Sequence, residues 1–130
     1  MTLVENALWD VSGEQLSFAA KGSGTSLTKQ RLGEHTVKTL SIDDLVEREE
    51  PQHLDFIKMD IEGAELAALQ GAEKTIRQFR PKLAIALYHS PQGFVSIPQW
   101  LSNLKLGYQF FLGHYSIHAW ETVLYGSPPI

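Results

Sequence analysis

The sequence predicts an α/β fold built on a mixed sheet, and two apolar segments with a helical pattern between them carry this prediction. The segments Leu54–Asp60 and Lys82–His89 are rich in apolar residues and have the length of strands. Between them, apolar residues recur every three or four positions from Leu66 to Phe79, which describes one face of a helix. A strand, a helix and a second strand of these lengths predict a crossover between two parallel strands.

Charged and turn-forming residues support the boundaries of this helix. Gly63 opens it, and Glu62 and Glu65 lie near its start, where acidic side chains suit the helix dipole. Basic residues lie near its end, including Arg80, and Pro81 stops it.

The rest of the chain predicts a second, antiparallel part of the sheet. A helix over Ile97–Lys105 leads to a strand over Tyr108–His114 and a last strand over Ala119–Tyr125. The link between these two strands is too short for a crossover, so we expect the last pair to be antiparallel.

The first fifty residues predict more strands and a short helix. Leu3–Trp9, Gln15–Ala20 and Thr36–Leu40 have the pattern of strands, and Gly22–Thr28 has that of a loop. Ser41–Val46 reads as a helix with a serine cap and acidic residues in its first turn.

Composition limits the class of protein. A length of 130 residues fits a single domain over 1–130, and the net charge of −4 and the lack of basic clusters argue against a nucleic-acid partner. No apolar run is long enough to cross a membrane, and no cationic and apolar leader opens the chain. With no cysteine present, we expect a cytoplasmic protein that has no disulfide and does not bind membranes.

Several motifs resemble the FkbM family of methyltransferases. The run Leu54–Glu65, followed by Gly71-Ala72 and Arg80-Pro81, is similar to the hallmark of that family. Further similarity lies at Asn6–Asp10, Thr25–Leu27, Val37–Leu45, His89, His114–Ser116 and Trp120–Tyr125. The resemblance implies a partial Rossmann-like class I methyltransferase sheet that uses S-adenosylmethionine to methylate a hydroxyl of a sugar or another small molecule.

The resemblance also implies that the main cofactor loop is missing from these 130 residues. In that fold the chain would begin at the third strand, Leu3–Trp9, so the glycine-rich loop and the acidic residue that binds the ribose should lie upstream of Met1. The only substitute is Gly22–Ser26, and because no helical pattern follows it we expect a surface turn. We therefore expect these residues by themselves to bind the cofactor weakly or not at all.

The predicted strand directions bring polar residues together at one edge of the sheet. Ligands of open α/β sheets bind beyond the carboxyl ends of the parallel strands. The strand ends and the return of the antiparallel last strand place six candidates there: Asp60, Glu62, His89, His114, His118 and Trp120.

We predict that His89 and Asp60 are catalytic. His89 is the candidate base for the hydroxyl proton, oriented by Asp60 or Glu62. The alternative is that His89 only closes its strand through a loop carbonyl. Asp60 and Glu62 are the candidate cofactor ligands; the alternative for Glu62 is a role at the helix start only.

The remaining candidates are expected to contact the methyl acceptor. These are His114, His118 and Trp120. A metal site formed by His114, His118 and Asp60 is disfavoured because the histidine spacing falls on a turn, so we expect no metal. The alternative function is an inactive methyltransferase-like remnant that acts as a self-associating or interaction module, with an open sheet edge at Leu54–Asp60 or at Leu3–Trp9.

Overall fold

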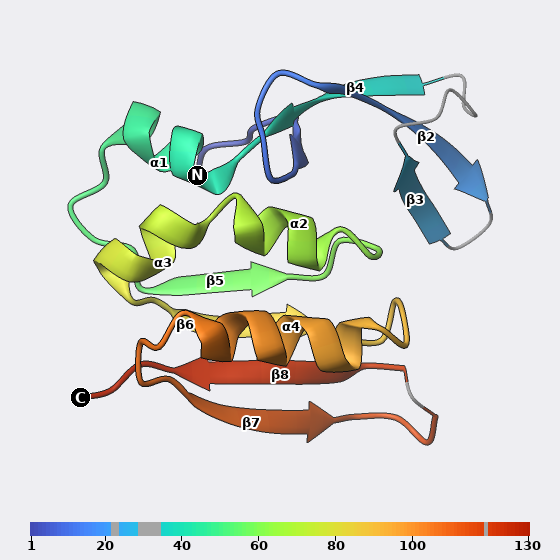
Figure 1. The fold of residues 1–130 in the computed structure, drawn as a ribbon. Coiled ribbons are helices and arrows are strands. Elements are labelled where there is room, and N and C mark those ends of the chain that lie inside the picture. Colours follow the sequence, from blue (N-terminus) through green and yellow to red (C-terminus); the bar gives the residue numbers. More distant parts are fainter. Residues whose placement is uncertain (22–23, 29–34, 119) are drawn as a thin grey trace.

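The computed structural model describes residues 1–21, 24–28, 35–118 and 120–130. These residues form two four-stranded sheets with strand orders β1-β4-β2-β3 and β5-β6-β8-β7 (Figure 1). The strands are β1 Ala7–Leu8, β2 Gln15–Lys21, β3 Gly24–Thr28, β4 His35–Leu40, β5 Phe56–Met59, β6 Lys82–Ala86, β7 Gln109–His114 and β8 Thr122–Ser127. The helices are α1 Ile42–Glu49, α2 Glu65–Gln70, α3 Glu73–Phe79 and α4 Gly93–Asn103.

The C-terminal sheet confirms the predicted strand directions. β5 pairs in parallel with β6, with Met59 opposite Ile85. β8 lies between β6 and β7 and is antiparallel to both, so β7 runs in the same direction as β5 and β6 (Figure 1). The last pair is therefore antiparallel, as predicted, and the final strand lies inside the sheet.

The helix that was predicted between β5 and β6 is two helices, α2 and α3, separated at Gly71 and Ala72. A Cβ atom on Gly71 would clash with the backbone oxygen of Trp9, so the chain packs backbone against backbone there. The Gly71 carbonyl accepts a hydrogen bond from the Asp43 amide at 2.8 Å. Periodicity predicted one helix because it carries no information about these two distant contacts.

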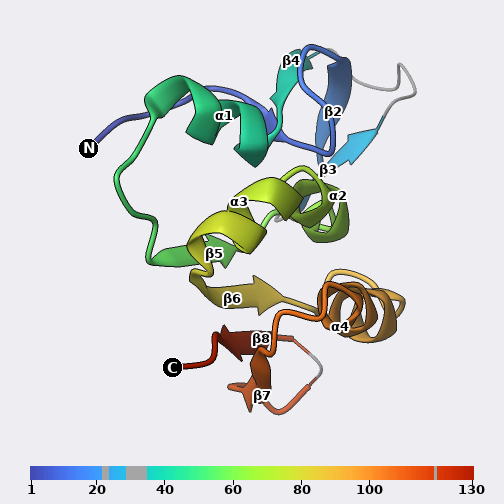
Figure 2. The same cartoon turned by 60° about the vertical axis from the view of Figure 1, so that its left-hand side comes forward.

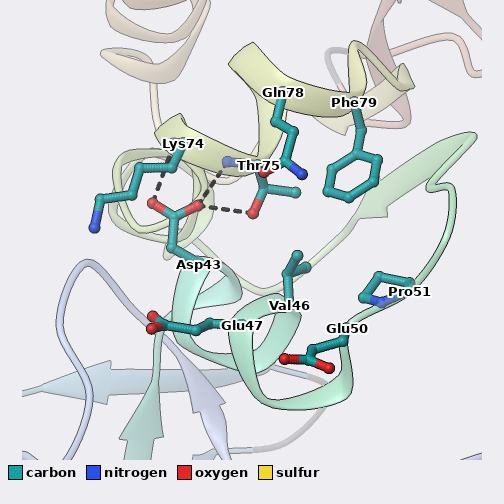
Figure 3. A pocket seen from close by; sticks show the side chains of 9 residues that line it. All are labelled: Asp43, Val46, Glu47, Glu50, Pro51, Lys74, Thr75, Gln78 and Phe79. Atoms are coloured by element: carbon teal, nitrogen blue, oxygen red, sulfur yellow. Dashed lines mark hydrogen bonds between the residues drawn. The ribbon is translucent and has the colours of Figure 1, made fainter.

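Asp43 of α1 also caps the second of the two helices (Figure 3). Its carboxylate accepts hydrogen bonds from the Lys74 amide at 3.1 Å, the Thr75 amide at 2.8 Å and the Thr75 hydroxyl at 2.7 Å. These bonds satisfy backbone N–H groups that the first turn of a helix leaves without partners. A cavity of about 400 Å³ lies beside this cap between α1 and α3.

We expect Asp43→Ala to lower the free energy of unfolding by about 1–2 kcal/mol, because it leaves the start of α3 without its cap. Urea unfolding followed by circular dichroism measures this loss. Glu47→Ala, an exposed change on the same helix, is the matched control and should change stability by less than about 0.5 kcal/mol. Equal effects of the two substitutions would contradict the capping role.

The core lies on one face of the C-terminal sheet, which α2, α3 and α4 cover (Figures 1 and 2). Side chains that alternate along β5 and β6 point into it, including Met59, Leu83 and Ile85. On the other face Phe56 is 55% exposed and Phe111 is also exposed, and no described helix covers them. Among the described segments, no helix is both long and apolar enough to cross a bilayer.

The N-terminal half differs most from the prediction. Only Ala7 and Leu8 of the predicted strand Leu3–Trp9 form β1, because the residues before Ala7 pair with no described strand. The prediction of a loop over Gly22–Thr28 is wrong for Gly24–Thr28, because these residues form β3, which pairs with β2. The possible cofactor cradle Gly22–Ser26 is thus partly strand, and its residues 22 and 23 lie outside the described residues.

Several helices and strands begin or end at other residues than predicted. The predicted cap of α1 is confirmed, since the Ser41 hydroxyl accepts a hydrogen bond from the Asp44 amide at 3.1 Å. α4 begins at Gly93, four residues before the predicted Ile97, because the Ser90 hydroxyl accepts the Gly93 amide at 3.1 Å. β6 ends at Ala86 rather than His89, which leaves His89 in the loop that follows.

Candidate active site

Three of the predicted site residues meet at one edge of the C-terminal sheet. The Nε2 atom of His89 lies 3.4 Å from an Asp60 oxygen and 3.6 Å from a Glu62 oxygen. The His89 side chain is only 10% exposed, whereas both carboxylates are partly open to solvent. The parallel pairing of β5 and β6 explains this meeting, because the loops that follow both strands emerge at the same edge.

The turn between β5 and α2 brings Glu62 back over the imidazole. Glu62 has a φ of 57° and Gly63 a φ of 100°, so both residues adopt left-handed backbone conformations. This conformation is uncommon for a residue other than glycine, and such residues concentrate at functional sites. A Cβ on Gly63 would lie 3.9 Å from the Cβ of His89, so the turn packs directly on the histidine.

Glu65 is a member of this site that the sequence analysis placed only near a helix start. Its Oε1 atom lies 2.7 Å from Nδ1 of His89, and its side chain is 3% exposed. The same oxygen accepts a hydrogen bond from the Ile61 amide at 2.9 Å. Asp60 and Glu62, predicted to orient His89, lie near Nε2, and Nδ1 on the other side of the ring contacts the Glu65 carboxylate.

A signal in the sequence could have revealed Glu65. It precedes Ala68 and Leu69 by three and four residues, so all three share the buried face of α2. A carboxylate on a buried helix face is rare unless another group pairs with it. Searching for such a partner among the strand ends would have led to His89.

Tyr88 and Trp120 extend the site on its other side. The Tyr88 hydroxyl donates a hydrogen bond to the Asp60 oxygen at 2.9 Å. Burial, followed by this hydrogen bond and the charge of Asp60, raises the pKa of Tyr88 to about 12, so its hydroxyl remains a donor at neutral pH. The exposed Trp120 ring meets the Tyr88 ring at 6.4 Å, edge to face, so Trp120 lies beside the site.

The other two predicted histidines are not part of this cluster. His114 ends β7, and its Nδ1 atom lies 2.9 Å from the Thr122 hydroxyl at the start of β8. His118 is exposed in the turn between these strands, and its carbonyl accepts a hydrogen bond from the Ser116 hydroxyl. Strand direction places both histidines at the same edge of the sheet as His89. Their contact with a methyl acceptor stays a prediction.

Within the described ranges, Asp60, Glu65 and His89 are the residues whose arrangement could hold a metal ion, with one ligand atom each within 4.8 Å of the others. This set of residues differs from the metal site of His114, His118 and Asp60 that the sequence analysis considered and disfavoured. Nδ1 of His89 and Oε1 of Glu65 already satisfy each other at hydrogen-bond distance, so an ion would have to separate them.

A second cavity, of about 450 Å³, begins next to this cluster. Its lining runs from the N-terminal segment and β1 to Leu45 of α1 and to Ile61, which directly follows Asp60. The lining is mostly apolar. Such a lining could accept the apolar part of a ligand.

Comparison with known proteins places this site in context. Residues 3–110 match the family described as the methyltransferase FkbM domain. The hexuronic acid methyltransferase AglP of Haloferax volcanii is 32% identical over 97 residues, which cover 75% of this chain and 38% of AglP. The crystal structure of methyltransferase FkbM from Methylobacillus flagellatus matches with a TM-score of 0.62 and 36% identity, covering 70% of this chain and 23% of that one. The chain thus spans less than half the length of these two proteins.

Proposed function

Because the chain belongs to the FkbM methyltransferase family and has a partial Rossmann-like fold, we propose that it is part of an S-adenosylmethionine-dependent O-methyltransferase. The proposed acceptor is a hydroxyl of a sugar or of another small molecule. A hexuronic acid methyltransferase among the similar proteins supports a sugar acceptor.

The observation that carries this proposal is the nearly buried His89 ring, whose Nε2 atom faces Asp60 and Glu62. In methyl transfer to an alcohol, the hydroxyl oxygen forms a bond to the methyl carbon while the bond from that carbon to the sulfonium sulfur breaks. The hydroxyl proton must then leave, and an imidazole is suited to accept it near neutral pH. We assign this role to Nε2 of His89, which becomes an imidazolium stabilised by the surrounding carboxylates.

Asp60 and Glu62 are assigned to the cofactor as well as to His89. Both carboxylates are partly exposed beside Nε2, so they can meet the positive charges of S-adenosylmethionine, its sulfonium and its ammonium group. The hydrogen bond from Tyr88 holds Asp60 in place. The exposed Trp120 ring suits the apolar face of a sugar, and His114 and His118 are assigned to acceptor hydroxyls.

A chimera tests this function, because the chain spans only part of its relatives. In it, the part of the Methylobacillus flagellatus FkbM methyltransferase that precedes the matched region is placed before this chain. We expect the chimera to move a labelled methyl group from S-adenosylmethionine to one of a panel of hexose and hexuronic acid glycosides. A chimera that binds the cofactor but labels none of them would contradict a sugar acceptor.

A second candidate function, self-association, is favoured by the open edge of β5. Within the described sheets, β5 pairs on one side only, and Phe56 on it is 55% exposed. An open apolar edge favours pairing with another copy of the chain. This role would not require catalysis.

We expect the chain to form dimers at micromolar concentration. Phe56→Lys should raise the dissociation constant of this dimer about tenfold or more, because a charged side chain on an edge strand opposes pairing with the edge of a second copy. Sedimentation equilibrium measures both constants. Leu112→Lys on β7, at the opposite edge, is the matched control and should leave the dimer intact. A monomeric chain at such concentrations would exclude this candidate.

A further inference from the structure

We propose that Glu65 is a positioning residue that holds His89 in the tautomer protonated at Nδ1 and so leaves the Nε2 lone pair facing the site. The contact between Oε1 of Glu65 and Nδ1 of His89 is 2.7 Å long and nearly closed to solvent. The catalytic consequence rests on the proposed function, but the tautomer is a property of this chain alone.

The local structure makes Glu65 an acceptor. It is the first residue of α2, where the helix dipole favours a negative side chain. Its Oε1 atom already accepts the Ile61 amide at 2.9 Å, a bond that only an acceptor can make. An ionised carboxylate has no proton to donate, so the proton in the contact with His89 belongs to Nδ1.

Other carboxylates compete for the ring proton. Asp60 and Glu62, on the loop after β5, lie near Nε2 and favour a proton on that atom. The neighbouring Tyr88 donates to Asp60 and so weakens its pull on the ring. Glu65 prevails because its contact is shorter, at 2.7 Å against 3.4 Å and 3.6 Å, and because burial strengthens electrostatic interactions that solvent weakens at the other two.

The tautomer determines what His89 can do. With the proton on Nδ1, Nε2 is an acceptor and can take a proton from a hydroxyl that approaches it. With the proton on Nε2, the ring can only donate toward the site. Glu65 therefore acts through His89 and needs no contact with cofactor or acceptor.

The ring nitrogens of the 130-residue chain, labelled with ¹⁵N at histidine, report the tautomer in long-range ¹H–¹⁵N spectra recorded across the pH range in which it is folded. We expect the neutral His89 ring to be protonated at Nδ1. Glu65→Gln keeps an acceptor oxygen and should keep this tautomer. Glu65→Leu removes the acceptor and should move the proton to Nε2, toward Asp60 and Glu62.

The exposed His53 is the internal control and should show the same tautomers in all variants. An Nε2-protonated His89 in the unaltered chain, or a ring doubly protonated throughout the pH range, would overturn the inference even if Glu65→Leu failed to fold. An unchanged tautomer in folded Glu65→Leu would do the same. Since no cofactor is present, failure of methyl transfer in the chimera would not affect this result.

The chimera supplies a second readout. There, Glu65→Leu should lower kcat by about 10²-fold, because a misdirected base costs that order of rate, while KM for S-adenosylmethionine stays within twofold. Glu65→Gln should recover most of the lost kcat. A rise in KM without a fall in kcat would contradict a role exerted through His89.

Discussion

Replacing His89 by alanine in the chimera should lower kcat by about 10²- to 10⁴-fold, the range that a positioned general base contributes. The affinity for S-adenosylmethionine should change much less, because the role proposed for the ring is to accept the hydroxyl proton and not to bind the main body of the cofactor. Single-turnover transfer of a labelled methyl group and calorimetric titration with the cofactor measure the two quantities separately.

A matched control is available in the same protein. His53 is exposed and forms only a loose ion pair with Asp55, so His53→Ala should leave kcat unchanged. If His89→Ala kept its turnover, or lost cofactor affinity in proportion to turnover, His89 would not be the base. Its contact with Glu65 would then be a structural hydrogen bond that closes the start of α2.

The 130-residue chain alone should bind S-adenosylmethionine with a dissociation constant above the millimolar range. In the family that the chain resembles, the glycine-rich loop and an acidic residue make the main contacts with the nucleoside. The corresponding candidate here, Gly22–Ser26, is partly strand β3. The remaining contacts at Asp60 and Glu62 must offset an association cost of several kcal/mol.

Isothermal titration of the chain and of the chimera makes the comparison direct. We expect the chimera to bind the cofactor in the micromolar range, a gain of about 10³-fold or about 4 kcal/mol. Asp60→Asn in the chimera should weaken this binding, because it removes a negative charge that we propose to meet the positive charges of the cofactor. Micromolar binding by the chain alone would show that the cofactor lies mainly on the described residues, with the cavity next to Ile61 as the first place to search.

The sequence by itself determined those features that depend on neighbours along the chain. The apolar runs of β5 and β6 and the amphipathic segment between them predicted a parallel pair. The serine cap of α1 was predicted because Ser41 is followed by acidic residues in the first turn, and the hydrogen bond from the Asp44 amide confirms it. Strand direction then placed Asp60, Glu62 and His89 at one edge, since residues that follow parallel strands emerge together.

Only the tertiary structure decided those features that depend on contacts between distant segments. The break between α2 and α3 follows from the approach of Trp9 to Gly71 and from the cap that Asp43 supplies. The position of β8 between β6 and β7 follows from pairing that a short link permits but does not require. Glu65 and His89 are 24 residues apart in sequence. Glu65 became a buried partner of His89 because α2 packs its apolar face on the sheet. Periodicity records which face of a helix is buried, but the packing of the whole chain determines which group that face meets.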